Sequence, residues 1–402
     1  MPQPRPLRTF LCAMLALCLL LTTLPLPAAA ARMADTPSIT LPRLEGVGSL
    51  SAQSAVLIDA ASGQVLYGKD EHARLPMAST TKVMTALCAA ELGELQRVIR
   101  IPAAAVGIEG SSVYLRAGEK LTLEQLLYAL LLASANDAAA AIAISLCGSI
   151  EAFAENMNKK AAELGLKDTH FENPHGLDSE QHYTTAHDLA LIARAALQHP
   201  SLRSIMATRS ITIPLDGTPS GRTLVNHNKM LRNYSGAIGV KTGFTKKSGR
   251  CLVSAAERDG LTLIAVTLHA PDDWNDHARL LDAGFAAYEN VVLCATNEFT
   301  TTLAVTGGKE AYVVAHNAHA ASLTLPRKRG AMLCTVELTR FLYADVARGE
   351  VVGTLVFRCD ANGDGTPEEL CRIPIRTAYG VQKRPRKTLL QKIKAWLTRS
   401  AT

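Results

Sequence analysis

Apolar residues recur along the chain in two kinds of pattern, which divide it into a mixed α/β part and a β-rich part. In the first part, runs typical of strands open and close the segment, and runs at helical spacing lie between them. The expected strands are 55–59, 64–67, 237–242, 251–256 and 261–269, and the expected helices are 79–92, 123–132, 138–146, 150–164, 185–197 and 273–288. This order favours an α/β domain, over residues 32–290, with one antiparallel sheet formed by the first and last strands and covered by helices.

After about Asn290 the pattern changes to short β-rich runs separated by turn residues. The expected strands are 300–305, 311–314, 332–338 and 351–357, and turns such as Gly307-Gly308 and Arg329-Gly330 lie between them. Such spacing predicts a separate small β-rich domain over residues 291–382. We find no internal repeat and no long low-complexity segment.

The first 31 residues have the order of a secretory signal peptide. Arg5 and Arg8 precede the apolar run 10–21, and small residues follow at 28–31, where cleavage is expected. The apolar run is too short for a membrane span, although a permanent N-terminal anchor is the alternative. The sequence therefore predicts an exported, extracytoplasmic protein.

The last segment, residues 383–402, predicts a basic amphipathic helix. Its apolar residues fall on one helical face; they are Leu389, Leu390, Ile393, Trp396 and Leu397. Seven basic residues and no acidic residue accompany them: Lys383, Arg384, Arg386, Lys387, Lys392, Lys394 and Arg399. This combination favours a helix lying on an anionic membrane surface, and the alternative is a helix docked on its own β domain.

Net charge and cysteine content exclude some functions. The whole chain carries +6, but the seven basic residues of the tail and the two of the signal peptide account for all of it, and the body between carries about −3. This distribution does not favour nucleic-acid binding by the body. Seven cysteines remain beyond the signal peptide without C-x-x-C spacing, so no zinc site is expected. Their odd number implies at least one free thiol.

Two features of the β-rich part leave alternatives open. Cys359 and Cys371 flank a probable turn and could form a disulfide across it. The turn itself, 360–365, begins like a calcium loop, with oxygen-bearing residues at positions 1, 3 and 5 and glycine at position 6. Position 12, however, is Cys371 instead of glutamate, which favours a simple polar hairpin turn.

The first segment that carries chemistry is Ser79-Thr80-Thr81-Lys82, at the start of a predicted helix. A spacing of three residues brings the hydroxyl and the amine to one helical face. A serine hydroxyl becomes a good nucleophile when a neighbouring base takes its proton, and a lysine can be that base if its pKa is lowered. The helix N-terminus also supplies N–H groups for an oxyanion. In isolation, the same pattern fits a helix-capping serine with a solvated lysine.

Two further polar segments lie in apolar surroundings. Ser134-Ala135-Asn136 falls between two very apolar helices, where the alternative explanation is a helix break with a capping residue. Lys241-Thr242-Gly243, followed by Phe244 and Thr245, ends a predicted strand, where the alternative is a cationic strand end at a turn. Each segment is ambiguous alone.

Together, and in this order, the three segments resemble the S-x-x-K, S-x-N and K-T-G motifs of penicillin-binding proteins and serine β-lactamases. More narrowly, the chain resembles the low-molecular-mass D-alanyl-D-alanine carboxypeptidases of the S11 serine peptidase family. The matching stretches are 76–82, 132–137, 171–178, 183–190, 226–228 and 239–245. The resemblance spans about 51–288, and 344–354 resembles the small second domain of that family.

The resemblance implies a transpeptidase-like catalytic domain and a role for each matching residue. Ser79 would be the acylated nucleophile, Lys82 its general base, and Ser134 a proton relay to the leaving D-alanine. The N–H groups of Ser79 and Phe244 would form the oxyanion hole. Lys241 would supply a positive field, Asn136 would bind the substrate backbone, and Thr242, with Thr245, its terminal carboxylate. The implied substrate-binding residues are Asn136, Lys241, Thr242, Gly243, Phe244 and Thr245.

The implied partners are a peptidoglycan stem peptide ending in D-Ala-D-Ala, β-lactams as inhibitors, and an anionic membrane surface at the tail. No cofactor or metal is expected. No arginine that binds the substrate carboxylate can be identified from the motifs. Two other functions stay open: a serine β-lactamase of the same fold, and a catalytically idle peptidoglycan-binding protein. The β-lactamase is disfavoured because Glu172 and Glu180 do not stand in an E-x-x-L-N setting.

Overall fold

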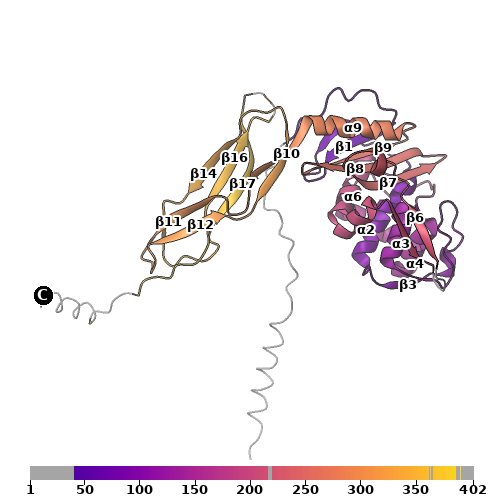
Figure 1. Ribbon diagram of the computed structural model, residues 1–402, viewed down its shortest axis with the longest axis horizontal. Coiled ribbons are helices and arrows are strands. Elements are labelled where there is room, and N and C mark those ends of the chain that lie inside the picture. Colours follow the sequence, from indigo (N-terminus) through magenta and orange to yellow (C-terminus); the bar gives the residue numbers. More distant parts are fainter. Residues whose placement is uncertain (1–39, 216–219, 362, 364, 386–389, 391–402) are drawn as a thin grey trace, which may run out of the picture.

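The computed structural model describes residues 40–390, except 216–219, 362, 364 and 386–389. The predicted signal peptide and nearly all of the predicted C-terminal helix lie outside the described residues. Two bodies follow one another along the long axis: a mixed α/β domain, and an elongated β-rich domain that begins with β10 (Tyr288–Cys294) (Figure 1). The boundary expected after residue 290 falls inside this strand.

The first domain is built on an antiparallel sheet with the strand order β2-β1-β9-β8-β7. Its strands are β1 (Ser54–Asp59), β2 (Val65–Lys69), β7 (Ala237–Thr245), β8 (Gly249–Arg258) and β9 (Leu261–Leu268). The first two strands of the chain therefore join the last three of the domain, as the sequence predicts. This closure brings β7 beside the start of the first long helix, which positions the site.

Helices cover both faces of this sheet. They are α2 (Lys82–Leu92), α3 (Leu123–Leu132), α4 (Asn136–Cys147), α5 (Ile150–Glu163), α6 (Ala186–Gln198), α7 (Pro200–Ala207), α8 (Met230–Asn233) and α9 (Asp273–Ala287). Helix α9 lies on one face and α6 and α2 on the other (Figure 1). Among the described residues no single helix is long and apolar enough to cross a membrane. Helices α4 and α5 meet those criteria only as a pair, bent by 85°.

Helix starts follow local capping chemistry. Thr122 and Gln125 form a reciprocal capping box at the start of α3, and Ser149 and Thr185 cap α5 and α6. In contrast, Ser79 and Ser134 make no capping hydrogen bond. Helix capping therefore does not explain these two serines.

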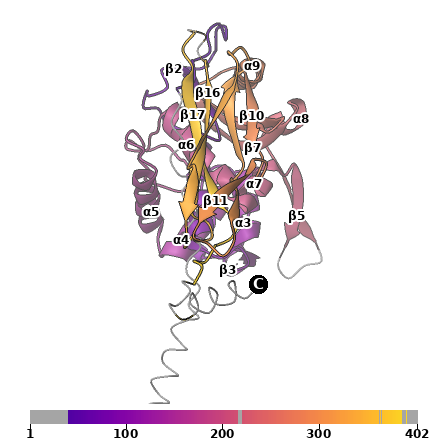
Figure 2. The same cartoon turned by 90° about the vertical axis from the view of Figure 1, so that its left-hand side faces the viewer.

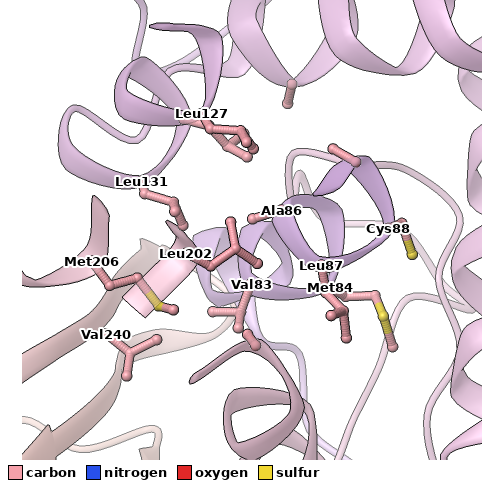
Figure 3. Close-up of a cluster of buried hydrophobic side chains, with 14 of the residues drawn as sticks. Val83, Met84, Ala86, Leu87, Cys88, Leu127, Leu131, Leu202, Met206 and Val240 are labelled. Carbon is pink, nitrogen blue, oxygen red and sulfur yellow. The ribbon is translucent and has the colours of Figure 1, made fainter. Parts of the chain in front are cut away.

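Helix α2 runs through the centre of the larger core. Val83, Met84 and Leu87 of this helix pack with Leu127 and Leu131 of α3, and α7 and β7 contribute further apolar side chains (Figure 3). A helix buried on nearly all sides has no amphipathic stripe, which agrees with the unbroken burial of residues 82–89. Because its surroundings are close-packed, the residues at its N-terminus are held in fixed positions.

The second domain contains a six-stranded sheet with the order β14-β16-β17-β12-β11-β15 and a two-stranded sheet formed by β10 and β13. Its further strands are β11 (Thr300–Thr306), β12 (Tyr312–Asn317), β13 (Ala321–Pro326), β14 (Leu333–Leu338), β15 (Phe341–Tyr343), β16 (Val351–Cys359) and β17 (Glu368–Thr377). The domain has its own apolar core, from Cys294 to Val381. Viewed along the long axis, these strands lie in front of the first domain, from which β5 (Ser210–Pro214) projects sideways (Figure 2).

Hydrogen bonds link the two domains close to β10. Thr324 donates a 2.8 Å hydrogen bond to the buried carboxylate of Asp59, and Arg327 Nε donates a 3.1 Å hydrogen bond to the Phe285 carbonyl at the end of α9. The two domains thus share fixed contacts at their junction.

The possible disulfide is not formed, because Cys359 and Cys371 are both free. In the β16–β17 hairpin, Cys359 lies opposite Glu368 and Cys371 opposite Phe357. The two sulfurs are therefore out of register. The Asp360 carboxylate accepts hydrogen bonds from the backbone N–H groups of Gly363 and Gly365, at 2.7 and 2.9 Å, as in a polar hairpin turn.

Candidate active site

The nucleophile stands in a short 3₁₀ turn, η1 (Ala78–Thr81), that leads directly into α2. Ala78, just before Ser79, has φ +48°, in the left-handed region that non-glycine residues seldom adopt. Such conformations cost of order 1–3 kcal/mol and cluster at functional sites, where the surrounding structure maintains them. Here the backbone of Gly176 (φ +87°) packs directly against the turn. A Cβ on Gly176 would lie only 1.9 Å from the Ala78 carbonyl oxygen.

Lys82 is fully buried, and its amine lies in the centre of a small polar cluster. The Nζ atom is 2.8 Å from Ser79 Oγ, 2.7 Å from Asn136 Oδ1 and 2.5 Å from the His175 carbonyl oxygen. The orientation of the Asn136 amide is determined by its other end, because Nδ2 donates a 2.5 Å hydrogen bond to the Glu109 carbonyl. The oxygen of this amide therefore faces Lys82.

These three contacts fit a neutral amine. A carbonyl oxygen only accepts hydrogen bonds, so Asn136 Oδ1 and the His175 carbonyl take two N–H groups of Lys82. A neutral amine has two hydrogens and one lone pair, and the remaining direction points to the Ser79 hydroxyl. That hydroxyl can therefore donate its proton to the nitrogen, as a general base requires.

Electrostatics favour the same protonation state. Burial, together with the neighbouring Lys241 ammonium, holds the pKa of Lys82 well below its ordinary value, and the Asp137 carboxylate opposes this shift. Burial alone lowers the pKa of Lys241 to about 7. A positive charge on Lys241 therefore favours the neutral form of Lys82. Its Nζ donates a 2.9 Å hydrogen bond to the Thr242 carbonyl.

The break between α3 and α4 brings Ser134 and Asn136 to the nucleophile. Ser134 has φ +60° and faces the same cavity as Ser79, whereas Asn136 is the first residue of α4 and lies behind the cavity, against Lys82. Next to it, the Asp137 carboxylate accepts hydrogen bonds from Ser112 Oγ and the Leu115 backbone N–H. This carboxylate anchors the loop that carries Ser111, another cavity residue.

Strand β7 forms the opposite wall, and the K-T-G segment lies within it, because the strand continues to Thr245. Lys241 is buried, and Thr242 faces the cavity. A Cβ on Gly243 would lie 3.1 Å from the backbone nitrogens of Ser79 and Thr80. A side chain here would push β7 and the nucleophile turn apart by a few tenths of an ångström, so glycine allows the closer approach. Phe244 follows, with its side chain exposed.

Between these walls lies an open cavity of about 360 Å³. Its lining residues come from seven segments: Ser79, Ser111, Ser134, His227, Lys229, Thr242, Gly243, Phe244, Arg250, Asp273 and Trp274. Three serines and a threonine thus meet at one opening with two cationic side chains, Lys229 and Arg250. Such a cavity suits a small substrate that carries a carboxylate.

Arg250 is an arginine of the cavity wall that the motifs did not identify. It lies opposite Phe244 in the β7–β8 register, and its guanidinium contacts Asp273 Oδ1 at 2.7 and 3.0 Å and lies 5.6 Å from the Trp274 ring centroid. The antiparallel pairing of two strands across the short turn 246–248 is the signal that could have revealed it. The His175 carbonyl was also missed, because a backbone acceptor has no sequence signature.

The structure brings together most of the residues expected from the sequence. Ser79, Ser134, Thr242, Gly243 and Phe244 line one cavity. Lys82, Asn136 and Lys241 are buried beside it. Thr245 lies elsewhere: its hydroxyl is 3.0 Å from Asp178 Oδ1 and 2.9 Å from Ser248 Oγ, at the turn after β7. A role of Thr245 in carboxylate binding stays a prediction.

An antiparallel sheet covered by helices on both faces, with these three motifs around one cavity, defines the class of penicillin-binding, transpeptidase-like enzymes. A family model described as D-alanyl-D-alanine carboxypeptidase, Peptidase_S11, matches residues 41–272. The chain belongs to this family of serine-type D-Ala-D-Ala carboxypeptidases. The family assignment and the fold agree with the sequence prediction.

Relatives and solved structures cover both domains. The chain is 33% identical to D-alanyl-D-alanine carboxypeptidase DacF of Bacillus subtilis over 344 residues, which cover 83% of this chain and 86% of that protein. It is 33% identical to DacA of Escherichia coli over 336 residues, or 79% and 82% of the two chains. The crystal structure of penicillin-binding protein 5 from Haemophilus influenzae superimposes with a TM-score of 0.66 at 25% identity, and covers 85% of this chain and all of that one (100%).

Proposed function

We propose that the enzyme is exported and removes the terminal D-alanine from peptidoglycan stem pentapeptides through an acyl-enzyme on Ser79. The observation that carries this mechanism is the environment of Lys82, whose amine has two carbonyl acceptors and the Ser79 hydroxyl around it. The signal-peptide pattern of residues 1–31 supports export, and the basic apolar pattern of 383–402 supports attachment to the outer face of the cytoplasmic membrane.

In the first step, Ser79 Oγ attacks the carbonyl carbon of the penultimate D-alanine while Lys82 takes the hydroxyl proton. The oxyanion that forms would accept hydrogen bonds from the N–H groups of Ser79 and Phe244. As the C–N bond breaks, the proton passes from Lys82 through Ser134 to the leaving amine, and D-alanine departs. Water then hydrolyses the ester, which regenerates the Ser79 hydroxyl and releases the shortened peptide.

Binding of the terminal carboxylate is assigned to Thr242 and Arg250. Both face the cavity, and the Arg250 guanidinium is oriented by Asp273. An arginine held at one edge by a carboxylate keeps its other N–H groups available for a second anion. Lys241, a buried residue of β7, adds a positive electrostatic field close to the cavity. Together these groups select a substrate that ends in a free carboxylate.

The same geometry supports acylation by β-lactams, whose strained amide occupies the position of the scissile D-Ala-D-Ala bond. A β-lactamase would also need a carboxylate that activates water for rapid ester hydrolysis. Glu172 is exposed, and its carboxylate accepts hydrogen bonds from Ser179 and from the Gln181 backbone. Asp273, the acid among the cavity-lining residues, pairs with Arg250. Because both carboxylates already have these partners, we expect slow hydrolysis of a penicillin adduct.

The direct test is incubation of the protein with a pentapeptide that ends in D-Ala-D-Ala, with released D-alanine measured. Release is expected from the wild type and not from Ser79→Ala. A protein that binds the peptide without release would support the idle peptidoglycan-binding alternative. Rapid, repeated turnover of penicillin would support the β-lactamase.

A further inference from the structure

Exposed aromatic side chains are unevenly distributed over the molecule. Among the described residues, six phenylalanine or tyrosine side chains are exposed, and two of them, Tyr114 and Phe244, belong to the catalytic domain. The other four lie in the β-rich domain: Tyr312 (62% exposed), Phe341 (44%), Tyr343 (70%) and Tyr379 (41%). An exposed aromatic cluster of this kind marks an interaction surface.

These four residues gather at one end of the six-stranded sheet. Tyr312 opens β12 opposite Ala304, and Tyr343 closes β15 opposite Thr306, so both lie where β11 ends. Tyr379 comes two residues after the end of β17, beside β12, because the Ala378 N–H binds the Val314 carbonyl. This end of the domain, reached by β11 and β12, is the one farthest from the catalytic domain (Figure 1). We call it the aromatic end.

Phe341 and Tyr343 form a pair of exposed rings in contact at the aromatic end. They alternate with Leu342, which packs against the domain core, so both rings lie on the outer face of the edge strand β15. Their ring centroids are 5.2 Å apart in an edge-to-face arrangement. No neighbouring strand covers this edge among the described residues.

The chain leaves the domain at the same place. Gly308 pairs with Lys383, and the Arg384 N–H donates a 2.8 Å hydrogen bond to the Gly307 carbonyl, directly after β11. Residue 386, where the basic apolar segment continues, is therefore only two residues from the aromatic end. Whatever surface this segment binds must lie close by, because each residue of chain spans at most about 3.6 Å.

Charge at the aromatic end complements an anionic surface. Five basic residues lie in its loops and strand ends, at Lys309, Arg340, Arg348, Lys383 and Arg384. The acidic residues there are Glu310, Asp345 and Glu350, and the Asp345 carboxylate accepts a hydrogen bond from the Lys383 backbone. The balance is positive before the four basic residues of 386–394 are counted.

We propose that the aromatic end is a membrane-docking surface, which places Phe341 and Tyr343 in the interface of an anionic lipid bilayer. Tyrosine and phenylalanine suit this depth, because the ring is apolar and the tyrosine hydroxyl stays at the level of the headgroups. The basic residues around them add attraction to anionic lipid. This contact attaches the β-rich domain to the membrane at the aromatic end, next to the basic apolar segment. This proposal concerns anchoring and is independent of the catalytic proposal.

The test compares two variants of the full chain in co-sedimentation with vesicles of phosphatidylglycerol and phosphatidylcholine. Phe341→Ser/Tyr343→Ser is expected to lower the partition coefficient about tenfold. The matched control Tyr114→Ser removes an exposed aromatic side chain far from this end and is expected to leave partition unchanged. An unchanged partition coefficient in the double serine variant overturns the proposal.

Two further measurements separate docking from misfolding and from self-association. Phe341→Trp/Tyr343→Trp keeps interfacial aromatic rings, so it is expected to bind vesicles at least as well as the wild type, and a tenfold loss here overturns the proposal. Sedimentation velocity without lipid is expected to give the same species for the wild type and the serine variant. If the wild type forms a dimer that the serine variant loses, the aromatic end binds a second copy of the chain and the proposal is wrong.

Discussion

Replacing Asn136 with aspartate tests whether Lys82 acts as a neutral base. The substitution preserves shape but places a carboxylate 2.7 Å from the Lys82 amine. An opposite charge at such a distance raises the pKa of the amine, typically by about 1–3 units. Because acylation needs the unprotonated amine, the acidic limb of the pH–rate profile should move to higher pH by the same 1–3 units.

At a pH on that limb, the acylation rate should fall by about 10- to 1,000-fold, since each pKa unit corresponds to a factor of ten. The substitution also removes the donor to the Glu109 carbonyl, which costs about 1–3 kcal/mol of stability. Stopped-flow acylation by a chromogenic β-lactam across pH, with thermal unfolding as a control, measures both effects. If Asn136 acted only by binding the substrate backbone, KM would rise and the acidic limb would stay in place. That result would refute the reasoning.

Substitutions at three other residues, two of them with matched controls, probe the site. Lys241→Gln removes a positive charge that lowers the pKa of the general base, so the acidic limb of acylation should move to higher pH, whereas Lys241→Arg should leave it nearly in place. Gly176→Ala should lower the free energy of unfolding, measured by chemical denaturation, by more than about 2 kcal/mol and should impair acylation. The control Gly107→Ala has a similar φ and no atom within 4 Å of the added Cβ, so it should lower the free energy of unfolding by only about 1 kcal/mol. Arg250→Gln should raise KM severalfold for a peptide with a free terminal carboxylate and leave KM for the corresponding C-terminal amide unchanged. Equal effects on both peptides would show that Arg250 does not bind the carboxylate.

Long apolar segments made the catalytic fold predictable. Helix α3 has the predicted bounds, and strands β1, β7, β8 and β9 differ from expectation by a few residues at most. Elements without a strong pattern were missed. Helix α7 has only eight residues, and the hairpin of β5 and β6 (Gly221–Val225) has mostly exposed or half-buried positions. Such elements depend on tertiary contacts more than on local periodicity.

The candidate site, like the fold, could be predicted only in part from the sequence. The three motifs identify side chains such as Ser79 and Lys82, because their chemistry is unusual at that spacing. The motifs do not reveal what surrounds the Lys82 amine, since one partner is the His175 backbone carbonyl, 93 residues away along the chain. They also do not reveal that both ends of the Asn136 amide make internal hydrogen bonds, and the substrate-binding role of Asn136 stays a prediction. Such contacts follow from how the helices close around α2.

The central claim is that Ser79 becomes acylated with Lys82 as its base. Intact mass spectrometry after brief incubation with penicillin, followed by peptide mapping, tests it directly on the wild type and on Lys82→Arg. We expect one adduct per chain, on Ser79, in the wild type, and little or none in Lys82→Arg, because a guanidinium stays protonated. An adduct on another residue, or acylation of Lys82→Arg at the wild-type rate, would contradict the account.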